Sequence, residues 1–398
     1  MPGLRSATVG AAAGLAGIPW RLSPGRGRPV PLDSPYLKRV VFVKPCCMGD
    51  LLMATPAFAV MRKALPDAHI ALSVGEYSLP AVKNNPNLDS IIDGEVGGTH
   101  HTLAGYMRLA RYLRRDRYTT ALVLDRSPML NMAAYLSRAH FRAGLDSNGR
   151  GVALTHPVPC PPDRARHEVE WYLDVVRALG IKAPSDEAYL EFYPTAEDSQ
   201  RAGQVLSEAL GEEGESEYGL VALHLGGGAN PGMHLPAKRW QPERWARVAD
   251  WIAETYEANI LVLGGPGEQD REAAEAFKTA LFPATLPYVA DLVGKLQWGE
   301  MGALLQRCTL FLGHDTGAMH LATAVRTPVV AVFGPSDPAR YGPWDPSGRS
   351  VTVAPAGTKS GAESLRKAAV AGDKYHDLVS VDEVWAAVQK VFRPGRMG

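Results

Sequence analysis

Two successive sets of short apolar runs constrain the fold of this chain more than any other feature of its sequence. Within each set the runs alternate with longer stretches typical of helices, such as residues 103–117. This alternation is typical of a parallel doubly wound sheet. The runs are Val40–Val43, Ile70–Val74, Ser90–Ile92 and Ala121–Leu124 in the first set, and Leu220–Leu223, Ile260–Leu263, Leu310–Leu312 and Val329–Phe333 in the second. The sequence therefore predicts an α/β protein with two such sheets.

An acidic, polar segment separates the two sets and predicts a domain boundary. Residues 1–35 are rich in Gly, Ala, Pro and Arg and carry no acidic residue before Asp33. We expect a disordered basic tail there, and a secretory signal is the alternative, which several glycines interrupt. The expected organisation is the tail (1–35), a Rossmann-like domain (36–195), a linker (196–217), a second Rossmann-like domain (218–378) and a final helix (379–398).

Composition excludes several classes of protein. Lys plus Arg and Asp plus Glu both number 42, whereas a dedicated nucleic-acid binder usually has a basic excess. No apolar run approaches the roughly 20 residues that span a bilayer. The four cysteines have no CxxC spacing, and the adjacent pair Cys46 and Cys47 suits neither a disulfide framework nor a zinc site, which favours a reducing compartment.

The segment Phe311–Val325 predicts an anion site. An apolar run ends at Gly313, and Asp315, Thr316 and Gly317 then precede an apolar helix. Free backbone amides and the helix dipole at such a helix start attract phosphate. An ordinary turn with a capping Asp is the alternative at this point.

Two other strand ends carry polar groups. Asp50 follows the first strand, at the sheet edge where ligands bind in open α/β folds. The strand from Leu220 opens into a loop with Gly226 and Gly227, whose backbones allow a ligand to approach closely, and with Lys238 and Arg239 beyond them.

Four motifs in this order resemble glycosyltransferase family 9, which includes the heptosyltransferases of lipopolysaccharide core synthesis. The resemblance spans about residues 38 to 393. The motifs are Met48-Gly49-Asp50 with Pro56, Lys238-Arg239-Trp240 with Trp245, Gly264-Gly-Pro-Gly-Glu268, and Asp315-Thr-Gly-Ala-Met-His320. The resemblance implies two Rossmann-like domains facing each other across a cleft, the GT-B type, with the final helix crossing back to the first domain.

The resemblance also implies an activity. The chain would be an inverting, metal-independent glycosyltransferase that moves a sugar, heptose, from an ADP-linked nucleotide-sugar to a glycolipid or glycan acceptor. Asp50 would be the general base, and Lys238 would neutralise the leaving diphosphate. The resemblance adds Asp315, Thr316, Gly317 and His320 to the donor site, Glu268 near the ribose and Leu296 near the adenine, beside Gly226 and Gly227.

The acceptor side is expected in the first domain. Met48 and Gly49 precede the base, and Arg108 and Arg111 lie on one face of a predicted helix. That face is either a solvated arginine face or a site for an anionic glycan or lipid head group. We expect a cytoplasmic enzyme, with peripheral contact to the inner membrane surface as an open alternative, and no nucleic-acid partner.

No metal or other cofactor is expected, because the sequence contains neither an Asp-x-Asp pair nor HExxH. Two other functions stay open at this point. One is a nucleotide-sugar epimerase or hydrolase of the same architecture, which would form product without an acceptor. The other is a non-catalytic sugar-nucleotide-binding protein.

Overall fold

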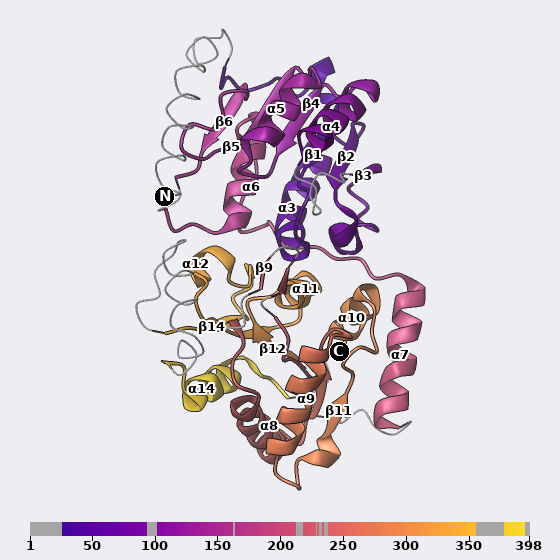
Figure 1. Cartoon of the computed structure of the whole chain (residues 1–398), viewed down its shortest axis with the longest axis vertical. Helices are drawn as coiled ribbons and strands as arrows, with labels where there is room; N and C mark the ends of the chain where they lie inside the picture. The colour runs from indigo at the N-terminus through magenta and orange to yellow at the C-terminus, as the bar shows by residue number, and fades with distance from the viewer. Residues whose placement is uncertain are drawn as a thin grey trace. The chain divides into compact units, whose positions relative to one another are not determined.

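The chain divides into two compact units, Met1–Tyr189 and Leu190–Gly398. The structure, a computed structural model shown in Figure 1, describes residues 26–93, 102–161, 164–211, 218–227, 229–230, 233–234, 238–355 and 378–394. Each unit is built on one six-stranded parallel sheet with helices packed against it. The predicted α/β class with two doubly wound sheets is therefore confirmed.

The sheet of unit 1 has the strand order β3-β2-β1-β4-β5-β6. The apolar runs of the first set lie in β1 to β4, as predicted. The sequence reading missed β5 and β6, which are less uniformly apolar and contain Arg142 and Pro157. The strands are β1 (Arg39–Val43), β2 (His69–Val74), β3 (Ser90–Asp93), β4 (Thr120–Val123), β5 (Phe141–Asp146) and β6 (His156–Pro159). The helices are α3 (Met48–Ala64), α4 (Leu103–Arg115), α5 (Pro128–Leu136) and α6 (Glu168–Arg177), with short turns η1 (Pro35–Leu37) and η2 (Glu76–Ala81).

Unit 2 repeats this topology, with the order β11-β10-β7-β12-β13-β14. Its parallel strands are β7 (Leu220–His224), β10 (Asn259–Leu263), β11 (Val289–Asp291), β12 (Leu310–His314), β13 (Val329–Val332) and β14 (Val351–Val353), and β8 (Ala229–Asn230) and β9 (Met233–His234) form a small antiparallel pair. Its helices are α7 (Ala196–Leu210), α8 (Pro242–Tyr256), α9 (Glu268–Ala280), α10 (Trp298–Leu305), α11 (Gly317–Ala324), α12 (Pro338–Tyr341) and α14 (Val381–Val391), with the short turn η5 (Leu286–Tyr288).

Both sheets follow the order 3-2-1-4-5-6 when their parallel strands are counted along the chain. In this topology the chain reverses direction across the sheet between strands 1 and 4, and ligands bind outside the carboxyl ends of those two strands. The two switch points are therefore β1 beside β4 in unit 1 and β7 beside β12 in unit 2.

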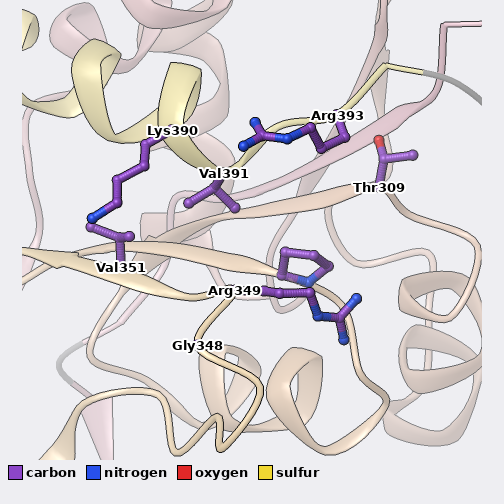
Figure 2. A pocket seen from close by; sticks show the side chains of 8 residues that line it. Thr309, Gly348, Arg349, Val351, Lys390, Val391 and Arg393 are labelled. Atoms are coloured by element: carbon purple, nitrogen blue, oxygen red, sulfur yellow. The ribbon is translucent and has the colours of Figure 1, made fainter.

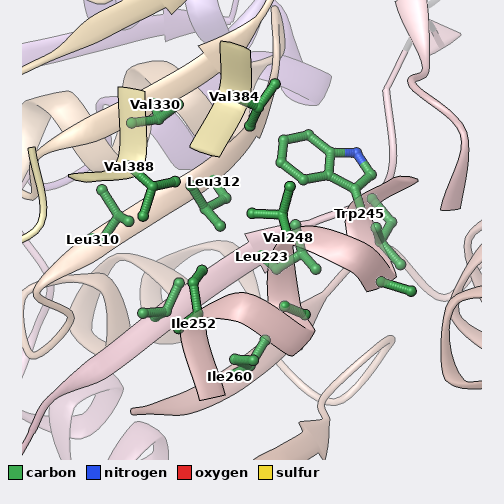
Figure 3. Close-up of a cluster of buried hydrophobic side chains, with 14 of the residues drawn as sticks. Leu223, Trp245, Val248, Ile252, Ile260, Leu310, Leu312, Val330, Val384 and Val388 are labelled. Atoms are coloured by element: carbon green, nitrogen blue, oxygen red, sulfur yellow. The ribbon is translucent and has the colours of Figure 1, made fainter. Parts of the chain in front are cut away.

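The core of unit 2 lies between its sheet and the helices α8 and α14. Strand residues such as Leu223 and Leu312 meet Trp245 and Ile252 of α8 and Val388 of α14 (Figure 3). Since α14 packs on α8, β13 and β14, the contacts that position this final helix belong to unit 2. Its predicted N-cap, Ser380, accepts a hydrogen bond from the Glu383 amide at 3.2 Å. The expected crossing back to the first domain stays a prediction.

The predicted tail and linker are partly structured. Residues 1–25 lie outside the described part of the chain, but residues 26–35 pack on unit 1, where the Val30 amide donates to the Leu179 carbonyl at 2.9 Å. The expectation of disorder up to residue 35 is therefore wrong for its last ten positions. The predicted linker contains α7, which packs against α10 of unit 2. None of the described helices combines the length and apolar character that a membrane span requires.

The packing of α10 against Phe192, in the segment that precedes α7, yields a stability prediction. A Cβ on Gly302 of α10 would lie 2.3 Å from the Phe192 ring, whereas a Cβ on Gly203 of α7 would meet only Arg307 at 3.5 Å. We expect Gly302→Ala to lower the free energy of unfolding by about 1–3 kcal/mol because the helix must move away. The control Gly203→Ala should leave it unchanged or raise it by up to about 1 kcal/mol. Urea titrations of both variants test this, and equal effects would contradict the packing argument.

Candidate functional site

A buried lysine joins two carboxylates at the switch point of unit 1. Lys44 follows β1, Asp50 lies in the first turn of α3, and Asp125 follows β4. The Lys44 ammonium lies 3.7 Å from Asp50 and 3.5 Å from Asp125. Only 7% of the Lys44 side chain is exposed, against 30% for Asp50 and 29% for Asp125. Both carboxylates are therefore accessible, while the cation between them is not.

A second charged pair lies behind the first. Arg126 forms an ion pair of 2.9 Å with Glu168, whose side chain is 1% exposed, and also donates to the Cys160 sulfur at 3.3 Å. From the same helix as Glu168, the Tyr172 hydroxyl donates to Asp50 Oδ1 at 3.3 Å. Helix α6 packs against α3, which fixes these groups around the predicted base.

The surroundings of Asp50 favour proton uptake. Burial raises the pKa of the Asp50 carboxyl, Lys44 opposes the increase, and the charges of Glu168 and Asp125 add to it. The net result is a pKa above the usual range. A general base gains strength as its pKa approaches the working pH, so Asp50 suits acid–base chemistry better than an ordinary surface aspartate does.

The other predicted residues of the first domain lie at two places. Met48 and Gly49 begin α3 directly before Asp50, after Cys47 as the N-cap. Arg108 and Arg111 lie on the exposed face of α4, whose buried residues are Tyr106, Leu109, Ala110 and Leu113. The first pair is therefore next to the candidate base, and the arginines form a separate exposed surface.

The cysteines differ from the sequence expectation. Cys46 and Cys47 are bonded to each other in a disulfide between adjacent residues, which the sequence reading did not foresee. Cys160 and Cys308 are free and buried. This bond lies within the loop between β1 and α3, and the Cys47 carbonyl accepts a hydrogen bond from the Leu51 amide at 2.9 Å.

The switch point of unit 2 carries an ion pair at a helix start. The Lys238 ammonium donates to Asp315 Oδ2 at 2.5 Å, and the two side chains are 14% and 9% exposed. Burial favours a raised pKa for the Asp315 carboxyl, but Lys238 outweighs it and holds the pKa below the usual range. Thr316 is the N-cap of α11, where its hydroxyl accepts from the Met319 amide at 3.4 Å. The structure thus brings Lys238, Asp315, Thr316, Gly317 and the buried His320 together, and their role in donor binding stays a prediction.

His314 organises this site and was missed by the sequence reading. The His314 ring is fully buried. Its Nε2 atom accepts hydrogen bonds from the Trp240 amide at 2.7 Å and from the Trp245 indole N–H at 3.2 Å. The ring proton must then be on Nδ1, which lies 3.2 Å from the Gly226 carbonyl. One neutral imidazole therefore ties the lysine segment, α8 and the glycine loop to the end of β12.

Arg239 has a different environment from Lys238. Its guanidinium donates to the Gly227 carbonyl at 2.8 Å and to Asp270 at 3.2 Å. A Cβ on Gly226 would lie 2.9 Å from the Asp270 carboxylate, so any larger residue there would require the Asp270 side chain to shift. Arg239 and Asp270 hold the loop after β7 against α9. The sequence did not predict a role for Asp270.

The predicted nucleoside contacts lie on neighbouring loops of the same sheet edge. Glu268 is exposed in the first turn of α9, after the Gly264–Gly267 loop that follows β10. Leu296 is half-buried in the loop after β11. The Gly294 amide donates to the Gly264 carbonyl at 3.0 Å, which joins these two loops.

One pocket of about 370 Å³ lies at the opposite, amino-terminal edge of the unit 2 sheet (Figure 2). Two of the cations that line it bind backbone carbonyls: Arg349 donates to the Arg326 carbonyl at 3.0 Å and Arg393 to the Phe392 carbonyl at 2.8 Å. The lining residues are Thr309, Pro328, Gly348, Arg349, Val351, Lys390, Val391 and Arg393. None of the predicted site residues belongs to it. Within the described ranges no three His, Cys, Asp or Glu side chains are grouped to hold a metal ion.

The comparisons with known proteins agree on one family. The family model described as glycosyltransferase family 9 (heptosyltransferase) matches residues 106–367. Lipopolysaccharide heptosyltransferase 3 of Escherichia coli is 26% identical over 308 residues, covering 74% of this chain and 83% of that protein. Lipopolysaccharide heptosyltransferase 2 of Salmonella typhimurium is 24% identical over 346 residues, covering 86% and 94%.

Solved structures show the same fold. The crystal structure of the family 9 glycosyltransferase from Veillonella parvula superposes with a TM-score of 0.73 at 25% identity, covering 89% of this chain and 97% of that one. The ADP-heptose lipopolysaccharide heptosyltransferase II of E. coli has a TM-score of 0.66 at 19% identity, covering 89% and 98%.

The role of His314 gives a stability prediction. We expect His314→Phe to lower the free energy of unfolding by about 2–4 kcal/mol, because two buried N–H groups lose their acceptor. The matched control is His224→Phe at the end of the neighbouring β7, where the buried Nδ1 has no partner among the described residues. The control should cost less than half as much in denaturant unfolding. If His314→Phe lowers the free energy of unfolding no more than the control does, the proposed role of His314 in holding these segments together is wrong.

Proposed function

Because the chain belongs to glycosyltransferase family 9, we propose that it transfers heptose from an ADP-linked donor to a glycolipid or glycan acceptor with inversion at the anomeric carbon. The single observation that carries this is the pair of switch-point sites. Unit 1 presents a carboxylate with a raised pKa, and unit 2 presents a cation and a helix start. These are the two kinds of group that one displacement at a sugar phosphate requires.

Asp50 would accept the proton of the acceptor hydroxyl. As the hydroxyl oxygen forms its bond to the anomeric carbon, the bond to the diphosphate oxygen breaks and its electron pair leaves with ADP. Asp50 is 30% exposed and therefore reachable by an acceptor. Its raised pKa lies closer to neutral pH than that of an ordinary aspartate, which makes it a stronger base. Met48 and Gly49, at the same helix start, would contact the acceptor.

The leaving ADP would be bound in unit 2. Lys238 has three N–H donors, and its hydrogen bond to Asp315 uses one of them, so the others can reach a phosphate oxygen. The amides at the start of α11, from Gly317 onward, and the Thr316 hydroxyl would bind the diphosphate further. His320 lies one turn along the same helix. Gly226 and Gly227 would allow close approach, Glu268 would bind the ribose and Leu296 would pack on the adenine.

The names of the relatives support a lipopolysaccharide-type acceptor. Arg108 and Arg111 on the exposed face of α4 would bind anionic groups of the acceptor or of the membrane that carries it. We therefore propose action at the cytoplasmic face of the inner membrane, without a metal or other cofactor.

The base is tested by Asp50→Asn. This variant should lose transfer activity by roughly 10²-fold to 10⁴-fold while its affinity for ADP stays unchanged, because an amide cannot accept the proton. ADP release from the ADP-heptose donor, with and without acceptor, is the measurement. Asp67→Asn, at an exposed position of the same unit, is the control and should behave as wild type. Wild-type turnover of Asp50→Asn would exclude the role, and release of ADP without acceptor would favour a hydrolase.

The phosphate contact is tested by comparing Lys238→Ala with Arg239→Ala. Both residues are partly buried cations in an ion pair, so they are matched in charge and in the partner they leave behind. We expect Lys238→Ala to weaken ADP binding by roughly 10-fold to 150-fold, as loss of a charge-assisted bond of about 1.5–3 kcal/mol predicts. Arg239→Ala should weaken it far less in calorimetry. Equal losses would remove the distinction.

Metal independence is tested with a chelator. If Lys238 and the α11 amides neutralise the diphosphate, transfer should keep its rate in excess EDTA, since these charges belong to the protein. Initial rates with EDTA, and after addition of Mg²⁺, provide the measurement. Full inhibition by EDTA that Mg²⁺ reverses would overturn this account of the diphosphate site.

A further inference from the structure

Lys44 occupies a position that a lysine does not usually tolerate. Its side chain is 7% exposed at the end of the first strand of the sheet. Removal of an ammonium group from water is costly unless opposite charges surround it. Asp50 at 3.7 Å and Asp125 at 3.5 Å provide those charges, one from each side of the switch point. Lys44 is thus shared between the proposed base and a second carboxylate.

Tyr172 contacts the same base from another direction. Its ring is 1% exposed, its hydroxyl donates to Asp50 Oδ1 at 3.3 Å, and the Lys44 ammonium lies 5.9 Å from the ring centroid. Burial, together with the charges of Asp50 and Glu168, raises the pKa of the Tyr172 phenol well above its ordinary value. The phenol therefore stays protonated and acts as a donor to the carboxylate.

The charges around Asp50 come from several elements. Lys44 follows β1, Asp125 and Arg126 follow β4, Glu168 and Tyr172 belong to α6, and the Cys47 backbone precedes α3. Three carboxylates, Asp50, Asp125 and Glu168, thus face two cations, Lys44 and Arg126. Arg126 is held by Glu168 at 2.9 Å. Lys44 is consequently the cation closest to both remaining carboxylates.

We propose that Lys44 and Tyr172 are positioning residues for Asp50, in which the shared ammonium keeps the carboxylate charged and the phenol fixes its orientation toward the acceptor. This inference rests on the proposed role of Asp50 as base. Asp125 has a distinct part in it. When Asp50 takes up the acceptor proton and becomes neutral, Asp125 still balances Lys44, so the buried ammonium is never left without a counter-charge.

The arrangement predicts opposite effects for two substitutions on the pH dependence of kcat. Lys44→Met removes the cation, so Asp50 should hold its proton to higher pH, and the acid limb should move up by about one to three pH units. Asp125→Asn removes a negative charge near Asp50, and Lys44 then has Asp50 as its nearest charged partner. The acid limb should therefore move to lower pH. Lys44→Arg keeps the charge and should largely retain the wild-type limb. A merely structural role would not produce shifts of opposite sign.

Tyr172→Phe tests the orienting hydrogen bond. We expect kcat to fall roughly tenfold or more, with KM for the donor unchanged and the acid limb moved up, because one bond to the carboxylate is lost. Tyr118→Phe is the matched control. Tyr118 is also buried in unit 1, but its hydroxyl lies 3.4 Å from Ser90, away from the base.

A readout without substrate separates this inference from the proposed function. The Asp50 carboxyl carbon can be titrated by NMR in the full chain, with Asp50→Asn to identify its signal. We expect the Asp50 titration to move up in Lys44→Met and in Tyr172→Phe and down in Asp125→Asn. Unmoved titrations in these variants would overturn the inference, even if Asp50→Asn is inactive. If Asp50→Asn is instead fully active, the proposed base is wrong, while the NMR shifts still decide whether Lys44 and Tyr172 control this carboxylate.

Discussion

The reversal of strand order in each sheet is the constraint on which both candidate sites depend. Helices cover a parallel sheet on both faces. Where the strand order reverses, the loops that follow two neighbouring strands run to opposite faces of the sheet and leave a crevice between them. In unit 1 the loops after β1 and β4 bring Lys44, Asp50 and Asp125 together. In unit 2 the loop after β7 brings Gly226 to His314 at the end of β12. The same topology therefore creates both sites, and side-chain chemistry alone distinguishes them.

The two sites balance buried charge differently. Around Asp50, burial raises the pKa of the base, and the carboxylates of Glu168 and Asp125 add to the increase that Lys44 opposes. At the start of α11, one lysine meets one aspartate at 2.5 Å, and the pKa of Asp315 falls. Excess negative charge suits a group that must gain a proton, because protonation relieves it. An ion pair beside the first amides of a helix suits a site that must bind an anion without changing its own protonation.

Local sequence could predict much of this arrangement, but it could not predict the partners. Asp50 and Thr316 lie at helix starts after recognisable strands, so their places could be predicted from the adjacent residues, and Lys238 belongs to the long loop after β7. The partners of these residues depend on strand order. Lys44 meets Asp125 only because β4 pairs with β1, and Glu168 reaches Arg126 only because α6 packs beside them. His314 follows the apolar run that ends at Gly313, and its role depends on Trp240, Trp245 and Gly226, which other elements bring to it.

The ion pair between Lys238 and Asp315 also affects how the proposed donor would bind. A free lysine would have to lose side-chain entropy when it contacts a phosphate, whereas Lys238 is already held at 14% exposure by its partner. The cost is electrostatic, because Asp315 stays charged and offsets much of the attraction that the ammonium exerts on a diphosphate. The helix start then becomes decisive, since its amides carry positive potential. On this argument Lys238 sets the position of the diphosphate, and the amides from Gly317 onward supply much of the attraction.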